Sequence, residues 1–242
     1  MASSETLRER CLSNLSRVRE SVAEACRRAG RPPADVTLVG VTKYVDATAA
    51  RCLLEAGCAD LAESRPQELW AKAAALADAR PEPRWHLVGH LQRNKVRRTL
   101  PVGALIHTLD SRRLLEALEA EAAAADTACE VLVEVNVSGD PARSGAMEAD
   151  AEPLLVAAAQ SPHLRLRGLM AMASHPDGPA ADARRDFARL RELRDRITAR
   201  GIVDAALVRE LSMGMSGDFA EAILEGSTMV RIGSALFAGL VP

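Results

Sequence analysis

The sequence predicts an α/β protein with the architecture of a (β/α)8 TIM barrel and one additional helix at its N-terminus. Eight short β-like runs alternate with segments rich in Ala, Leu, Glu and Arg, a composition that favours helix. Strands that alternate with helices form parallel sheets, and 242 residues are close to the roughly 250 typical of such a barrel. An open doubly wound sheet is the alternative, but it is expected to carry a glycine-rich turn after its first strand, and residues 43–46 contain no glycine.

The first predicted element is a helix near the N-terminus. Gly30 and the Pro32-Pro33 pair are typical residues to end it. Apolar residues recur before them at spacings of three and four positions, the pattern of one buried helical face: Leu7, Cys11, Leu15, Val18 and Val22.

The remaining chain is predicted to supply the eight strands and their helices. The clearest helical segments are Ser111–Ala125 and Ala180–Arg200. No linker or low-complexity stretch interrupts the alternation, so residues 1–242 are expected to form a single domain. The eight β-like runs are Val36–Lys43, Asp60–Ser64, Arg84–His90, Ala104–Asp110, Cys129–Ser138, Leu164–Ala173, Arg209–Ser216 and Thr228–Ala238.

Composition argues against several classes of partner. Lys and Arg total 31 against 33 Asp and Glu, so there is no basic field to hold a nucleic acid, and with 2% aromatic residues there are few platforms for stacking bases. The N-terminus has no apolar signal segment, and no run of about 18 apolar residues could span a membrane. The five cysteines are scattered, without metal-ligand or CxxC spacing, and are expected to be buried thiols in a reducing cytoplasm.

The fifth β-like run places polar groups inside the predicted barrel. Its alternation puts Val131, Val133 and Val135 beneath the helices and points Glu134 and Asn136 inward. An unpaired buried polar group costs about 1–3 kcal/mol. These two side chains therefore need either partners on neighbouring strands or a ligand.

Lys43 ends the first run, at the edge of the barrel where active sites form. Such a lysine is either a solvated charge or a buried amine, and a desolvated amine can attack a carbonyl to form a Schiff base. Tyr44, the one tyrosine of the sequence, follows it. If the strand continues through Tyr44, its ring points away from Lys43 towards the helices, a poor position for a base beside that lysine.

The ends of the last two runs resemble an anion site. Ser212, Met213, Gly214, Met215 and Ser216 end the seventh run, and the eighth carries residues 231–234, Arg-Ile-Gly-Ser. Small residues let backbone N–H groups approach a phosphate, and phosphate sites after strands seven and eight recur in this architecture. The glycines could equally make tight turns. Together with a Schiff-base lysine, the pattern indicates a phosphate-bearing aldehyde.

These residues, taken with motifs elsewhere, resemble the pyridoxal phosphate homeostasis protein family, one-domain relatives of the alanine racemase N-terminal barrel. The resemblance covers about residues 5–240, and its last two segments are highly specific in combination. The matching motifs are Val41-Thr42-Lys43, Glu63 with Gln67-Glu68, Trp85–Gly89, Leu91-Gln92, Asn94-Lys95, Arg143–Gly145, Arg167–Met170, Leu211–Ser216 and Gly226–Gly233.

The resemblance implies a fold-type III barrel that holds pyridoxal 5'-phosphate as a Schiff base on Lys43. By analogy, Arg231 faces the pyridine nitrogen, and because arginine keeps its proton it leaves that nitrogen unprotonated and weakens the ring as an electron sink. The remaining roles are also implied only by analogy. The phosphate is expected on Ser212 or Ser216 and on Gly233 and Ser234, while Asn136 and Met215 line the pocket and His86 lies deeper in the barrel.

Several positions depart from the family pattern. Ser64 and Arg65 replace an asparagine and an aromatic residue that normally border the cofactor, and Val45 replaces a second lysine. His90 and Arg93 replace a proline and a serine in the third loop. The covalent and phosphate contacts are untouched, so these changes bear on how tightly the cofactor is held and how it is handed on.

The implied function is intracellular pyridoxal phosphate homeostasis without turnover, by a monomer that supplies cofactor to apoenzymes. The alternative is an amino-acid racemase or related fold-type III enzyme. Racemisation needs a base on each face of the cofactor, and neither a second domain nor a well-placed tyrosine is expected here to supply the second base. A sugar-phosphate aldolase would leave the Arg231 motif unexplained, and a purely structural role would need no cofactor. No metal is expected.

Overall fold

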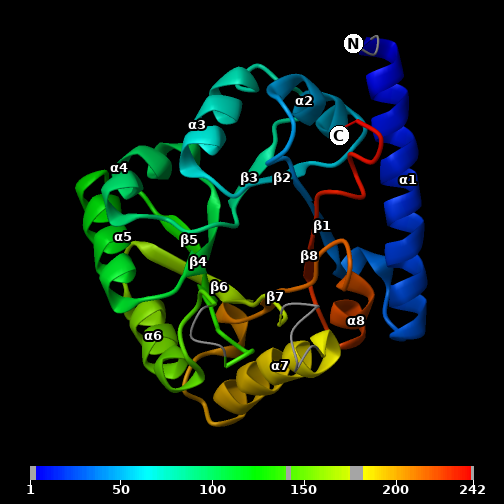
Figure 1. The fold of residues 1–242 in the computed structure, drawn as a ribbon. Helices are drawn as coiled ribbons and strands as arrows, with labels where there is room; N and C mark the ends of the chain where they lie inside the picture. The colour runs from blue at the N-terminus through cyan, green and yellow to red at the C-terminus, as the bar shows by residue number, and fades with distance from the viewer. Residues whose placement is uncertain (1–3, 140–142, 175–181, 241–242) are drawn as a thin grey trace.

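The computed structural model describes residues 4–139, 143–174 and 182–240, and it confirms the predicted barrel. Eight parallel strands close in the order β1 to β8, with β8 paired to β1, and the helices surround them (Figure 1). Among the described residues, no helix is both long and apolar enough to cross a membrane. The strands are β1 (Thr37–Val41), β2 (Asp60–Glu63), β3 (Arg84–Leu87), β4 (Leu105–Leu109), β5 (Cys129–Glu134), β6 (Leu164–Met170), β7 (Glu210–Ser212) and β8 (Met229–Ile232).

Eight α-helices lie in the described part of the chain. The longest, α1, is the predicted N-terminal helix, and α5 and α7 correspond to the two clearest helical segments of the sequence. Their bounds are α1 (Ser4–Arg28), α2 (Ala47–Glu55), α3 (Pro66–Ala75), α4 (Val96–Thr99), α5 (Arg112–Ala124), α6 (Glu148–Gln160), α7 (Ala183–Ala199) and α8 (Phe219–Leu224).

Helix α1 packs outside the barrel against α2 and α8, with its predicted apolar stripe buried except for Leu7, which is partly buried. Gly30 follows it in the left-handed region, at φ +67°, which glycine adopts without strain. The buried Asn14 amide donates to the carbonyl oxygens of Leu236 and Ala238, at 3.0 and 3.1 Å. These bonds fasten the segment after β8 to α1.

Every strand ends before the C-terminal limit predicted from the apolar run. β1 stops at Val41, two residues before Lys43, and β8 stops at Ile232. The reason is that apolar residues beyond the strands are buried by turns rather than by the sheet. Leu236 and Phe237, for example, lie in a turn and are fully or almost fully buried. The shorter strands leave the polar residues after them in loops around the C-terminal mouth.

The barrel interior mixes small apolar clusters with polar side chains. Val131, Val133 and Val135 face the helices, as the alternation predicts, while Leu132 packs inside the barrel. Glu134 is also buried, and its carboxylate accepts a hydrogen bond from Ser144 Oγ at 2.6 Å. Burial raises the pKa of Glu134, an effect that the hydrogen bond from Ser144 partly offsets.

Candidate functional site

A cavity of about 340 Å³ opens at the C-terminal mouth of the barrel. This is the end at which barrel enzymes place their ligands, and the volume is in the range of small-molecule sites. Six of the predicted site residues line it: Lys43, Met215, Ser216, Arg231, Gly233 and Ser234. The other lining residues are Val41, Tyr44, Ser64, Val88, Met172 and Gly217.

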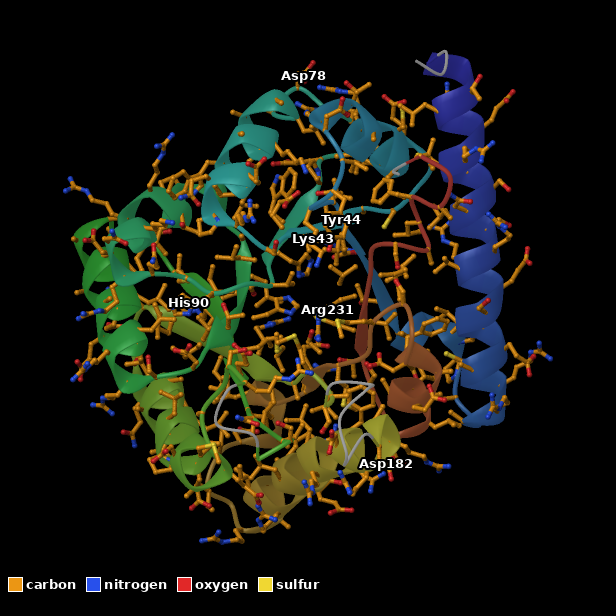
Figure 2. All side chains as sticks on the ribbon, in the orientation of Figure 1. Lys43, Tyr44, Asp78, His90, Asp182 and Arg231 are labelled. Atoms are coloured by element: carbon orange, nitrogen blue, oxygen red, sulfur yellow. The ribbon has the colours of Figure 1, made fainter. Side chains whose placement is uncertain are left out.

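Lys43 carries an amine that is exposed and open to the cavity. Of the two predicted environments, the solvated one is confirmed, since the side chain is exposed in the first loop after β1. Among the described residues, no carboxylate or carbonyl accepts a hydrogen bond from its Nζ, which lies 4.7 Å from the centre of the Tyr44 ring. Figure 2 shows Lys43 and Arg231 both near the centre of the barrel mouth.

The predicted direction of Tyr44 is wrong. The prediction assumed that β1 continues through this residue, but the strand ends at Val41, so the alternation no longer applies. The ring is 65% exposed and packs against the Lys43 ammonium instead of beneath the helices. The one tyrosine of the sequence is therefore part of the cavity wall, on the same side as the lysine.

Arg231 forms the buried floor of the cavity. Its Nη1 donates to the carbonyl oxygen and to Oγ of Ser212, both at 2.7 Å, and Nη2 donates to the Ala171 carbonyl at 3.0 Å. Burial lowers the pKa of Arg231 to about 10, against the opposing effect of Asp218 and Glu134, so the guanidinium stays charged at neutral pH. Among the described residues, none accepts from Nε or from the second Nη2 hydrogen, which leaves two N–H groups for a ligand.

The turns after β7 and β8 meet at the cavity, beside the end of β1. The backbone N–H of Gly233 lies 3.4 Å from Ser216 Oγ, so these two turns adjoin each other. A Cβ on Gly233 would lie 3.3 Å from the Val41 carbonyl oxygen, tighter than most such contacts. With the hydroxyl of Ser234 and the backbone of Gly217 beside them, these groups form a set of donors suited to an anion.

Three predicted residues do not line the cavity. Ser212 is fully buried below Arg231, and its Oγ accepts a hydrogen bond from that guanidinium. Of the two predicted serines, only Ser216 therefore lies where it could contact a phosphate. Asn136 lies beyond the end of β5, and its Oδ1 accepts from Ser138 Oγ and the Gly139 N–H within the same loop. His86 is buried deeper in the barrel, as expected.

Two polar groups that matter for the site were not predicted as part of it. Lys72 of α3 is buried and ion-paired with Glu63, and its Nζ also donates to the Thr42 carbonyl at 2.7 Å. His107 of β4 is buried inside the barrel. His107 could have been found from strand alternation, because it shares a face with the inward-pointing Leu105, but nothing in the helical pattern marks Lys72.

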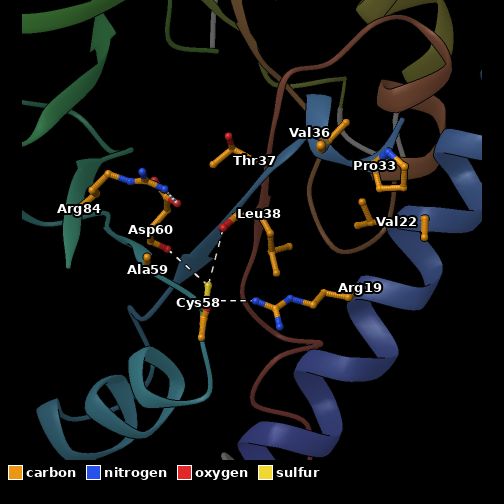
Figure 3. Close-up of a pocket in the computed structure, with 13 residues that line it drawn as sticks. Arg19, Val22, Pro33, Val36, Thr37, Leu38, Cys58, Ala59, Asp60 and Arg84 are labelled. Atoms are coloured by element: carbon orange, nitrogen blue, oxygen red, sulfur yellow. Dashed lines mark hydrogen bonds and ion pairs between the residues drawn. The ribbon is translucent and has the colours of Figure 1, made fainter. Parts of the chain in front are cut away.

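The cavity between α1 and the N-terminal ends of β1 and β2 is no catalytic candidate. It measures about 520 Å³ and includes the thiol of Cys58, near Arg19 and Asp60 (Figure 3). Burial raises the pKa of Cys58 to about 12, and the Asp60 charge adds to the effect, so the thiol is an inert donor at neutral pH. Among the described residues, no cluster of three His, Cys, Asp or Glu side chains could hold a metal.

Comparison with known proteins places the whole barrel in one group. Residues 13–241 match the family model of the alanine racemase N-terminal domain. A pyridoxal phosphate homeostasis protein of Pseudomonas aeruginosa is 40% identical over 93% of both chains. Its counterpart in Aquifex aeolicus is 38% identical over 92% of this chain and 95% of its own.

A solved structure is similar at the level of both fold and sequence. PipY of Synechococcus elongatus PCC7942, solved with PLP bound, is 34% identical, with a TM-score of 0.76 over 90% of this chain and 100% of its own. The fold, the extent of the match and these identities agree with the resemblance of the sequence motifs. The chain therefore belongs to the pyridoxal phosphate homeostasis protein family, whose barrel is that of the alanine racemase N-terminal domain.

Proposed function

We propose that this chain binds pyridoxal 5'-phosphate in the mouth cavity, attached to Lys43, and serves the homeostasis of that cofactor without turnover. The observation that carries the proposal is the composition of the cavity lining. An amine that has no carboxylate partner in the described part of the chain, a buried guanidinium with free N–H groups and a pair of Gly/Ser turns all line the same 340 Å³ space.

The residues present fit the three functional groups of the cofactor. The Lys43 amine suits the aldehyde, with which it forms a C=N bond as water leaves. Ser216, Gly233 and Ser234 offer hydroxyl and backbone donors to the phosphate. Arg231 offers a free N–H to the ring nitrogen, which is an acceptor only while unprotonated.

The identity of Arg231 supports a role without turnover. Bound pyridoxal phosphate supplies an electron sink for carbanions, and that sink is strongest when its ring nitrogen is protonated. A guanidinium keeps its own proton and cannot protonate the nitrogen. Tyr44 lies against Lys43 itself, so it does not supply a base on the opposite face of the cofactor, as racemisation requires.

The first experiment tests attachment. The purified protein, incubated with pyridoxal phosphate, is expected to gain visible absorbance, and borohydride should fix the adduct on Lys43, identified by peptide mass mapping. The sequence contains only three lysines, so Lys72 and Lys95 serve as internal controls. A protein that stays colourless, or an adduct on Lys95 in place of Lys43, would refute the proposed site.

The second experiment separates this reading from the racemase alternative. The loaded protein is incubated with L-alanine and other amino acids, and the enantiomers are followed by chiral chromatography. We expect no conversion beyond that of free pyridoxal phosphate. Sustained turnover that Lys43→Ala abolishes would establish an enzyme.

We further propose that the protein acts as a cytoplasmic monomer that passes cofactor to apoenzymes. Five free cysteines, four of them buried, suit a reducing compartment. Gel filtration with light scattering tests the monomer. Mixing the loaded protein with an apoenzyme, with and without a dialysis membrane between them, tests whether transfer needs contact.

A further inference from the structure

A row of polar side chains crosses the barrel interior below the cavity. Five strands supply it from inward-facing positions: Arg231 of β8, Ser212 of β7, His107 of β4, His86 of β3 and Asp60 of β2, all buried. Because β4 and β7 are not neighbours in the sheet, the contact between their side chains spans the lumen. The row therefore joins the cavity floor to the opposite, N-terminal mouth of the barrel.

Neighbouring members of this row are within hydrogen-bond distance throughout. Arg231 Nη1 lies 2.7 Å from Ser212 Oγ, which lies 2.9 Å from His107 Nδ1. His107 Nε2 then lies 2.9 Å from His86 Nδ1, and His86 Nε2 lies 3.1 Å from Asp60 Oδ1. Each imidazole thus uses both of its nitrogens within the row.

The two ends of the row have fixed roles. A guanidinium can only donate, so Ser212 Oγ accepts from Arg231. A carboxylate can only accept, and the Asp60 carboxylate also receives Arg84 Nε at 2.8 Å from the solvent side (Figure 3). Burial alone would raise the pKa of Asp60, but the hydrogen bonds from His86 and Arg84 outweigh it and lower that pKa, so the group is ionised at neutral pH.

These ends fit one continuous order of the protons between them. In this order, Ser212 Oγ accepts from Arg231 and directs its own hydrogen to the next partner in the row, His107 Nδ1. His107 then carries its proton on Nε2 and donates it to His86 Nδ1, while His86 carries its proton on Nε2 and donates it to Asp60. Burial, with the charge of Arg231 adding to it, lowers the pKa of His107 well below its usual value, which agrees with a neutral ring.

We propose that His86 and His107 are positioning residues of the cofactor site, both held as neutral Nε2–H tautomers in a chain of hydrogen bonds that runs one way from Arg231 to Asp60. The inference rests on the proposed function for the ligand that Arg231 meets. The chain itself depends only on residues of this barrel.

The consequence concerns the orientation of Arg231. With both Nη1 hydrogens donated to Ser212 and one Nη2 hydrogen donated to Ala171, the guanidinium plane is fixed, and Nε–H and the second Nη2–H are the groups left for the cavity. Without the histidines, the Ser212 hydroxyl is free to rotate and to donate elsewhere. The histidines therefore limit the ways in which Arg231 can present a free N–H to a ring nitrogen.

The tautomers can be measured without any ligand. Long-range 1H–15N correlation spectra of the 15N-histidine apoprotein distinguish Nε2–H from Nδ1–H rings, with His86→Gln and His107→Gln used for assignment. His163, which is paired with Glu119 outside the barrel, serves as a reference ring. We expect His86 and His107 as single Nε2–H tautomers. An Nδ1–H form or tautomer exchange at His107 would overturn the proposal.

Two variants test whether the chain holds Arg231. Ser212→Ala removes only the linking hydroxyl, and Ser227→Ala is its matched control, a fully buried serine that bonds to backbone carbonyls outside the row. In the apoprotein, the Arg231 Nη resonances should broaden in Ser212→Ala and His107→Gln but remain unchanged in Ser227→Ala. Unchanged Arg231 resonances in both row variants would overturn the positioning role.

The loaded protein gives the second readout. Ser212→Ala and His107→Gln should weaken pyridoxal phosphate binding by about 5- to 10-fold, the size of one lost hydrogen bond, and shift the visible absorbance in a common direction. Ser227→Ala should stay within about twofold of the unmodified protein. If the unmodified protein binds no pyridoxal phosphate, the proposed function fails, while the tautomer spectra still decide the chain.

Discussion

Two lysines near the end of β1 have amines in opposite environments. Lys72, from α3, is buried and paired with Glu63, and it donates to the carbonyl oxygen of Thr42. Lys43, the residue that follows this threonine, is exposed in the cavity; its Nζ lies 4.7 Å from the centre of the Tyr44 ring and has no hydrogen-bond partner among the described residues. Thr42 Oγ1 also donates to Glu63 at 2.5 Å, so the threonine is held from both its side chain and its backbone.

The contrast shows how one residue type is divided between structure and chemistry. A buried ammonium has to be paired, because an unpaired charge in the protein interior lowers stability by several kcal/mol. An amine that is to form a covalent bond has to be accessible and without a competing carboxylate. The Lys72–Glu63 pair holds Thr42 in place. It thereby also fixes the backbone position of the next residue, Lys43, which carries the reactive amine.

The largest expected effect is on attachment. Lys43→Ala should abolish the visible absorbance and the borohydride adduct, since neither Lys72 nor Lys95 lines the cavity. Because Lys43 makes no structural hydrogen bond in the described residues, urea unfolding should change by no more than about 0.5 kcal/mol. A large loss of stability together with retained absorbance would reverse the assigned roles of the two lysines.

Lys72→Met should give the opposite result. The substitution leaves the Glu63 carboxylate buried without its cation, and breaking such a pair typically costs about 3–5 kcal/mol. Urea unfolding followed by circular dichroism measures the loss. Lys95→Met is the control, and it should change stability by no more than about 0.5 kcal/mol. Equal stability of the two variants would show that the buried pair is dispensable.

Removing both charges tests whether the loss of stability in Lys72→Met comes from the unpaired Glu63 carboxylate. Replacing a buried ion pair by apolar residues is often neutral or stabilising. The double variant Lys72→Met/Glu63→Leu should therefore be destabilised by about 1–3 kcal/mol less than the sum of the single variants. The Thr42 hydroxyl still has an acceptor, the Ala62 carbonyl at 3.3 Å. Strict additivity would contradict the pairing.

The same contrast between an ion-paired group and one without an ionic partner extends to two interior carboxyl groups, Asp60 and Glu134. Their contributions to folding stability have opposite pH dependence. The lowered pKa of Asp60 means that its stabilisation is present above its ordinary pKa of about 3.9 and is lost as the pH falls towards the lowered value. Burial raises the pKa of Glu134, so its contribution is present below about 4.3 and is lost as the pH rises through the raised value.

Denaturant unfolding across the acid range checks these signs. The free energy of unfolding of the unmodified protein should exceed that of Asp60→Asn by less and less as the pH falls. Glu134→Gln should gain stability relative to the unmodified protein as the pH rises from 4 to 7. Parallel stability curves for either variant would contradict the corresponding shift.

The smallest expected effect concerns the aromatic ring beside the reactive lysine. An exposed contact between an ammonium and a tyrosine ring is worth about 0.5–1 kcal/mol. Tyr44→Leu keeps an apolar wall and should weaken pyridoxal phosphate binding by at most about fivefold, as measured by absorbance titration. Loss of the adduct in this variant would give Tyr44 a larger part in attachment than the contact implies.

The ends of the β-like runs and the motifs there predicted much of the site, while strand alternation had limits that are instructive. The run ends and motifs located Lys43, Ser216 and Arg231 near the barrel mouth, and all three line one cavity. Alternation described the fifth strand. It failed at Tyr44, because alternation describes a residue only while the strand lasts. It also gave no contact between Lys72 and Glu63, which depends on how α3 packs over β2.

The sequence by itself determined the number and order of strands, the family and the chemical groups available at the mouth, since these follow from local periodicity and motifs. Only the tertiary structure decided which lysine is paired, where Tyr44 points and that His107 meets Ser212 across the lumen. Those facts depend on contacts between residues far apart in the chain, 105 positions in the last case. Closing the barrel creates such contacts, and no local pattern encodes them.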